Sequence, residues 1–130
     1  MRLLLDSHTF LWFVEGSPRL SVKVRSLIED ADNDVFLSIT SVWELSIKVS
    51  KGVLTFNTPF DEFIPSQIAG NDFELLPVAL PHAIRVAALP RFDDHKDPFD
   101  RMLIAQAQSE AMSLLSYDTV FDRYAVSRIW

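Results

Sequence analysis

The 130-residue sequence contains no cysteine, only three glycines, and fewer basic than acidic residues. The lack of cysteine excludes a disulfide framework and any metal site built on thiolates. The net charge of −6 argues against a protein that binds nucleic acid through its overall charge, but not against an enzyme that meets RNA through metal ions and a local basic rim. No apolar run could span a bilayer, and Asp6 and His8 interrupt the N-terminal one, so we expect no signal peptide and a cytoplasmic location.

The composition is that of a soluble globular protein, with 48% hydrophobic and 23% charged residues. A chain of this length can bury a substantial hydrophobic core. No linker, internal repeat or low-complexity segment interrupts it. We therefore predict a single domain over residues 1–130.

Short apolar segments alternate with segments of helical pattern along the chain. The expected strands cover 2–5, 35–39, 73–78, 113–116 and 126–130, and the expected helices cover 8–15, 21–30, 41–51, 59–69, 81–89 and a segment that begins at Asp97. Because the strands are apolar on both faces, the pattern predicts an α/β fold with a short parallel sheet covered by helices on both sides.

Four acidic residues fall at strand-to-helix junctions of this predicted fold. Asp6 follows the first strand, Glu44 lies near the start of the helix after the second, Asp100 lies in the first turn of the helix that Asp97 caps, and Asp118 follows the fourth strand. Each has a structural explanation alone, since Ser41-Val42-Trp43-Glu44 has the spacing of a capping box and acids favour first turns. Ligands of such folds bind at the carboxyl edge of the sheet, so we expect the four carboxylates to converge there.

Carboxylates that lie together repel one another and become protonated unless a cation binds among them. Oxygen ligands suit hard ions such as Mg²⁺ or Mn²⁺. Such an ion lowers the pKa of a bound water, and a second ion ~4 Å away stabilises the leaving oxygen of an in-line displacement. The predicted chemistry is phosphodiester hydrolysis.

Four segments resemble the PIN-domain family, and most closely the VapC-type toxins of bacterial toxin–antitoxin pairs. They are Leu3–Ser7, Ser41–Glu44, Asp97–Ala107 and Leu114–Asp118. The resemblance covers essentially the whole chain in order. It implies a three-layer α/β/α nuclease that uses Mg²⁺ or Mn²⁺ to cut RNA and is held inactive by an antitoxin.

By position, Asp6, Glu44 and Asp100 match the family's metal-binding acids, and Asp118 matches a fourth that is less strictly needed. The resemblance also gives supporting roles to hydroxyl residues, Ser7 after the first acid and Ser116 before the last. Asp97 belongs to an Asp-Pro-Phe-Asp variant, so its role stays open between N-cap, outer-shell acid and ligand.

Other residues allow two interpretations. Arg101, Lys48 and Lys51 either rim the site and contact phosphate or are exposed helix charges. Trp12, Phe13 and Trp43 are most simply core, and the alternative is that they are part of an interface. We expect a homodimer, and an antitoxin segment in a hydrophobic groove formed by the helices at 8–15 and 21–30. A solvated loop is favoured over a peripheral metal site for Asp93-Asp94-His95, and a cap or surface position for His8 and His82.

Rival functions are less well supported. A haloacid-dehalogenase-like phosphatase needs an acid two places after Asp6, where His8 stands, and a receiver domain needs paired acids near the first strand and a late lysine. A catalytically silent PIN-like scaffold would retain four repelling acids without benefit. A housekeeping PIN nuclease of RNA processing or decay remains an open alternative to a toxin.

Overall fold

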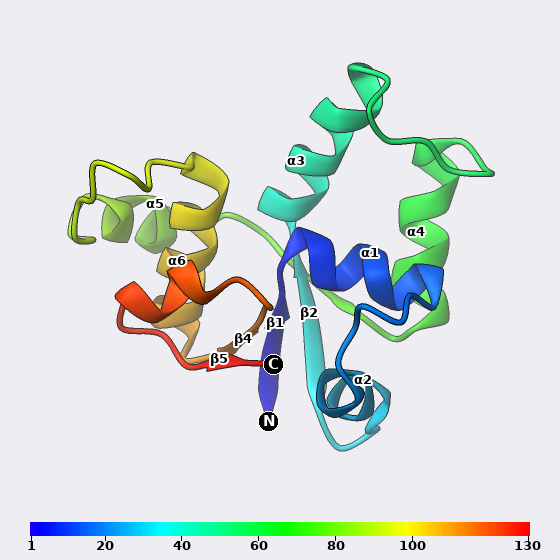
Figure 1. Cartoon of the computed structure of the whole chain (residues 1–130), viewed down its shortest axis with the longest axis horizontal. Helices are drawn as coiled ribbons and strands as arrows, with labels where there is room; N and C mark the ends of the chain where they lie inside the picture. The colour runs from blue at the N-terminus through cyan, green and yellow to red at the C-terminus, as the bar shows by residue number, and fades with distance from the viewer.

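The computed structural model describes residues Met1–Trp130. Each of the first three strands is followed by two helices, and a 3-10 helix separates the last two strands (Figure 1). The strands are β1 (Arg2–Leu5), β2 (Asp34–Ser38), β3 (Glu74–Leu76), β4 (Ser113–Leu115) and β5 (Arg128–Ile129). The helices are α1 (Ser7–Glu15), α2 (Val22–Glu29), α3 (Ile39–Ser50), α4 (Phe60–Gly70), α5 (Leu80–Val86), α6 (Pro98–Glu110) and the 3-10 helix η1 (Thr119–Arg123). None of them combines the length and apolar character required to cross a membrane.

All five strands are parallel and lie in the order β3-β2-β1-β4-β5. The central strand β1 pairs with β2 on one side, where Leu4 lies opposite Phe36, and with β4 on the other, where Leu4 lies opposite Leu114. The chain builds the sheet outward from β1 to β3 and then returns to the other side of β1. Folds of this kind bind their ligands at such a reversal point, which here falls at the carboxyl ends of β1 and β4.

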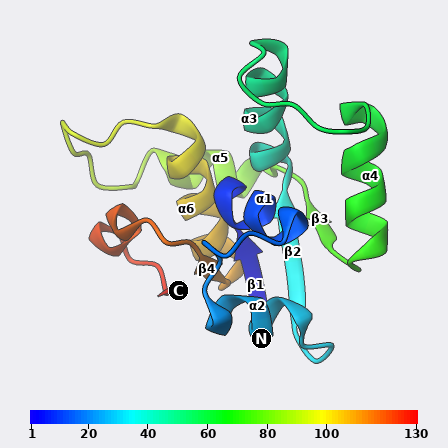
Figure 2. The same cartoon turned by 45° about the vertical axis from the view of Figure 1, so that its right-hand side comes forward.

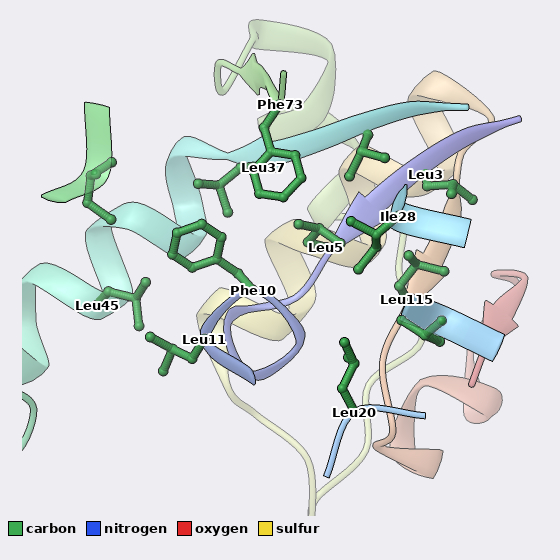
Figure 3. Packing of buried hydrophobic residues seen from close by; sticks show 13 residues of the cluster. Leu3, Leu5, Phe10, Leu11, Leu20, Ile28, Leu37, Leu45, Phe73 and Leu115 are labelled. Carbon is green, nitrogen blue, oxygen red and sulfur yellow. The ribbon is translucent and has the colours of Figure 1, made fainter. Parts of the chain in front are cut away.

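Helices cover both faces of the sheet, which confirms the predicted three-layer α/β/α fold. Leu3 and Leu5 of β1 pack on one face with Phe10 of α1 and with residues of α2, α3 and α4 (Figure 3). Leu4 points to the other face and packs with Ile104 of α6. Figures 1 and 2 show α5 and α6 on one side of β1 and α1 and α2 on the other, while α3 extends beyond the carboxyl ends of the strands.

The direction of α6 brings its first turn to the carboxyl edge. Arg2, at the start of β1, donates a hydrogen bond to the backbone carbonyl of Glu110, the last residue of α6. The opposite end of α6, which Asp97 caps as predicted, therefore lies at the edge where the strands end. The middle of the helix, from Leu103 to Ala107, is buried, as its nearly all-apolar sequence predicts.

Helix α3 starts earlier than predicted. The hydroxyl of Ser38, not that of Ser41, accepts the capping hydrogen bond, from the N–H of Thr40 at 3.0 Å. The capping-box interpretation of Glu44 is therefore wrong, because Glu44 lies in the second turn, where no free helix N–H group needs an acceptor. Elsewhere the predicted elements are present, with β3 and β5 shorter than expected.

Candidate active site at the carboxyl edge of the sheet

Asp6 links the central strand to the first helix. Its backbone N–H donates to the carbonyl of Leu115 at 3.3 Å, which extends the pairing of β1 with β4 by one residue. Its Oδ1 accepts the N–H of Thr9 at 2.8 Å and so caps α1. The carboxylate is 5% exposed, and its Oδ2 has no protein hydrogen-bond donor. Capping thus explains one oxygen of Asp6 and leaves the other available to a ligand.

Ser7 connects this junction to α3. Its hydroxyl donates a hydrogen bond to Oε1 of the half-buried Glu44. The bond joins the first residue of α1 to the second turn of α3, across 37 positions of sequence. Glu44 therefore points towards the end of β1, as a site residue must.

Asp97 and Asp100 have different roles at the start of α6. Asp97 is the N-cap, because its Oδ1 accepts the N–H groups of Phe99 at 2.8 Å and of Asp100 at 3.0 Å. The side chain of Asp100 is 26% exposed. Burial raises the pKa of Asp100 to about 6, against the effect of a hydrogen bond from His95, and the negative charges of Asp97 and Glu44 add to the rise. The ring centroids of Trp43 and Phe99, the neighbours of Glu44 and Asp100, lie 5.0 Å apart, so α3 and α6 bring these two acids to the same region.

His95 is a site residue that the sequence did not reveal. The prediction of a solvated loop is wrong for this residue, which is 9% exposed. Its Nε2 lies 3.0 Å from Oδ2 of Asp100, and its Nδ1 lies 2.7 Å from the hydroxyl of Tyr124. An ionised Asp100 can only accept, so Nε2–H donates to it and Nδ1 accepts from Tyr124. Phe92, in the same loop, is the only sequence sign that part of this loop packs inward.

Asp118 lies at the same edge, beyond the end of β4. Its Oδ1 accepts the N–H of Val120 at 3.0 Å and caps η1, and its own N–H donates to the hydroxyl of Ser116 at 3.1 Å. Ser116 is fully buried, so this predicted supporting residue fixes the backbone that carries Asp118. The guanidinium of Arg128 donates to the Ser116 carbonyl at 3.1 Å and places a positive charge near Asp118.

Arg101 is tied to backbone carbonyls. It donates to the carbonyl of Pro90 at 2.8 Å and to that of Val86 at 3.4 Å. The side chain therefore fastens the end of α5 and the following loop to α6. Of the other two predicted rim residues, Lys48 is half-buried and Lys51 is exposed.

The oxygen donors of this cluster suit a hard divalent cation. No three side chains of His, Asp or Glu, however, are close enough together to hold one ion. Glu44 and Asp100 each have one oxygen in a hydrogen bond, with Ser7 and His95 respectively. Coordination of one ion by three carboxylates therefore requires side-chain movement, which the partly exposed Glu44 and Asp100 can make by rotation about their side-chain bonds.

Trp12 and Phe13 are half-buried by the chain itself. The ring centroid of Trp12 lies 5.2 Å from that of Tyr117 and 5.8 Å from that of Trp130. The ring of Phe13 lies 5.8 Å from that of Phe73. An apolar groove of about 580 Å³ lies between α3 and α4, and not between α1 and α2. Its lining is Ile39, Val42, Ile64, Pro65, Ile68, Ala69, Asp72, Phe73 and Leu75.

The PIN domain family model matches residues 3–127. The chain therefore belongs to the PIN domain family, as the resemblance of its acidic segments implied. No curated protein sequence matches it significantly.

Several solved structures share the fold at low sequence identity. One is a chain of VapBC2 from Rickettsia felis bound to a DNA fragment from the VapBC2 promoter, with a TM-score of 0.69 at 14% identity. The alignment covers 100% of this chain and 99% of that chain. FitAcB from Neisseria gonorrhoeae has a TM-score of 0.61 at 20% identity, with coverage of 98% and 96%. VapBC-1 from nontypeable Haemophilus influenzae has a TM-score of 0.62 at 13% identity, with coverage of 99% and 97%.

Proposed function

We propose that this protein is a Mg²⁺- or Mn²⁺-dependent endoribonuclease that acts as the toxin of a toxin–antitoxin pair. The observation that carries the proposal is the acidic cluster at the reversal point of the sheet, where Glu44 and Asp100 interact next to the end of β1. Membership of the PIN domain family supports nuclease chemistry. The similar solved structures include complexes described as VapBC and as a toxin–antitoxin complex, which supports the role of toxin.

Asp6, Glu44, Asp100 and Asp118 would hold the ion. When bound, a divalent ion supplies a water of lowered pKa and neutralises charge on the phosphate oxygens. Without a metal ion, burial disfavours the ionised form of Asp100 and raises the pKa of its carboxyl to about 6. A cation there would therefore relieve an existing electrostatic cost.

The surrounding residues prepare the acids for this task. The extended β1–β4 pairing fixes the backbone of Asp6, and Ser7 holds Glu44 towards it. His95 fixes one oxygen of Asp100 and leaves the other free. Ser116 holds the backbone before Asp118. These contacts keep the carboxylates at the carboxyl edge of the sheet, from where side-chain rotation would bring them onto a bound ion.

The catalytic proposal is tested by incubating the purified protein with single-stranded RNA and resolving the products on a denaturing gel. We expect cleavage in Mg²⁺ or Mn²⁺, none in EDTA, and a loss of at least about a hundredfold in the Asp6→Asn and Asp100→Asn variants. A single-stranded DNA of the same sequence is the matched substrate control. Cleavage that persists in EDTA or in both variants would show that this cluster is not the catalytic site.

We also propose an antitoxin partner and a homodimer. Trp12 and Phe13 keep part of their surface exposed, and the groove between α3 and α4 adds an apolar surface with exposed Ile39 and Leu75. Apolar surfaces of this kind favour protein partners. Co-expression with the protein of the neighbouring reading frame tests whether each surface binds that protein. Trp12→Ala and Phe13→Glu alter the exposed aromatic side chains of α1, and Ile68→Glu alters the groove between α3 and α4. Sedimentation velocity of each variant reports the oligomeric state.

A housekeeping nuclease would share the catalytic site but lack a dedicated inhibitor. In that case no small neighbouring protein would suppress the RNA cleavage, and expression would not arrest growth. A silent scaffold would fail the cleavage test while it still bound RNA or protein. The two alternatives therefore separate from the toxin in the same pair of assays.

A further inference from the structure

A cavity of about 530 Å³ lies beside the acidic cluster and takes no part in the function proposed above. It is bounded by α3, the end of α5, the loop before α6 and the first turns of α6. Its lining is Thr40, Trp43, Val78, Val86, Arg91, Phe92, His95, Lys96, Pro98, Arg101 and Met102. Its volume is in the range of small-molecule sites, and an apolar lining with a few polar groups is typical of them.

Thr40 of α3 lies in the cavity wall, where it is 2% exposed. Its hydroxyl oxygen makes no hydrogen bond and is covered by neighbouring atoms, so it does not open onto the cavity. The groups that a ligand would meet lie at the mouth of the cavity.

Aromatic and cationic side chains mark the mouth of the cavity. Trp43 is 59% exposed, an unusual position for so large an apolar group, and it is held edge-on by Phe99 with ring centroids 5.0 Å apart. Arg91 and Lys96 are exposed, and neither forms an ion pair. In a chain of net charge −6, two unpaired cations beside an exposed indole favour a ligand that combines a flat ring with negative charge.

The cavity is also in contact with the acidic cluster. His95 forms part of its wall and is the hydrogen-bond partner of Asp100. A group bound in the cavity therefore lies within one side chain of the acids.

We propose that this cavity binds one nucleotide of the single-stranded RNA substrate, with the base against Trp43 and the phosphate near Arg91 and Lys96. The inference rests on the ribonuclease function proposed above and adds to it a site for a base beside the cleaved bond. Stacking on exposed aromatic rings and contacts to base edges are how proteins hold single-stranded RNA.

The first test uses the Asp6→Asn protein, so that cleavage plays no part, and the four ribonucleoside 5′-monophosphates as probes. We expect at least one of them to shift the indole N–H resonance of Trp43 in a ¹H–¹⁵N spectrum, with the resonance assigned from a Trp43→Phe sample. Ribose 5-phosphate, which lacks the base, should leave the Trp43 resonance in place. If no nucleotide shifts it at millimolar concentration, the proposal is wrong.

The second test measures binding of a fluorescein-labelled single-stranded RNA to the same protein by anisotropy. Trp43→Leu, which keeps an apolar side chain but removes the ring system, should weaken binding about tenfold, whereas Trp43→Phe should keep most of it. Arg91→Gln should reduce the dependence of binding on salt concentration.

The outcomes separate this proposal from the catalytic one. If the wild-type protein cleaves RNA with Mg²⁺ while Trp43→Leu binds RNA normally, the ribonuclease stands and the base site is refuted. If nucleotides bind at Trp43 but no RNA is cleaved, the base site stands and the ribonuclease is refuted. If Trp43→Leu binds RNA normally but loses the antitoxin, the cavity is a protein docking site and the proposal is overturned.

Discussion

Replacing Asp100 by asparagine is expected to stabilise the metal-free protein at pH 8. Burial raises the pKa of this carboxyl from 3.8 to about 6, the hydrogen bond from His95 opposes the rise, and the charges of Asp97 and Glu44 increase it. The native protein therefore holds a carboxylate that would ionise more easily in the unfolded chain. Asparagine has the same shape, can still hydrogen-bond to His95, and carries no charge.

The sign and size of the effect follow from proton linkage. Since the folded pKa lies above the unfolded one, the stability that protonated Asp100 confers is fully present below about pH 4 and is lost as the pH rises through 6. A shift of about two pKa units corresponds to about 3 kcal/mol. Because the side chain of Asp100 is 26% exposed, solvent screening reduces this electrostatic cost. We therefore expect Asp100→Asn to raise the free energy of unfolding at pH 8 by about 2 kcal/mol.

Urea unfolding in EDTA measures this gain in the free energy of unfolding. A thermal melt at pH 8 should show the same gain as a rise of about 6 °C in the melting temperature. The gain should shrink between pH 6 and pH 4. Asp93→Asn is the matched control, because Asp93 is exposed in the neighbouring loop and forms no ion pair. The stability of the Asp93→Asn protein should equal that of the wild type. If Asp100→Asn fails to stabilise at pH 8, or stabilises equally at pH 4, Asp100 does not carry the electrostatic cost assigned to it.

Three further substitutions test other contacts. His95→Ala should reduce the Mn²⁺-induced rise in melting temperature, because loss of an outer partner weakens metal affinity about tenfold, and an unchanged rise would exclude a positioning role. Asp97→Ala should destabilise the metal-free protein by about 1 kcal/mol in urea, because two N–H groups of α6 lose their acceptor, and an unchanged midpoint would contradict the cap. Gln106→Leu should lower the free energy of unfolding by about 2 kcal/mol, because the O–H donor of Ser38 and the Pro77 carbonyl lose their partner, and wild-type stability would refute this.

Local chemistry predicted most of the fold. Ser21 and Asp97 mark the starts of α2 and α6, because each side-chain oxygen accepts the N–H groups that a helix start leaves free. The start of α3 was missed because Ser38 and Ser41 are both suitable caps, and tertiary packing decides between them. The strand order could not be predicted, since apolar strands of similar length carry no signal for their neighbours.

The site was predictable where its residues follow strands and not where they depend on distant contacts. Asp6 comes directly after β1 and Asp118 three residues after the end of β4, so a parallel sheet brings them to one edge whatever the strand order. His95 is buried only because Tyr124, 29 residues later, and Asp100 fold around it. The apolar groove was expected between α1 and α2, yet those helices bury Val24, Ile28 and Phe10 in the core, and the open apolar surface lies between α3 and α4.

The most direct test of the central claim, that the acids at the carboxyl edge form a divalent-metal site, is calorimetric titration of Mn²⁺ into the metal-free protein at pH 8. The account predicts saturable binding to the wild type that weakens at least about tenfold in Asp6→Asn and in Asp100→Asn, with Asp93→Asn unchanged. Equal binding by all four proteins, or no binding by the wild type, would contradict it.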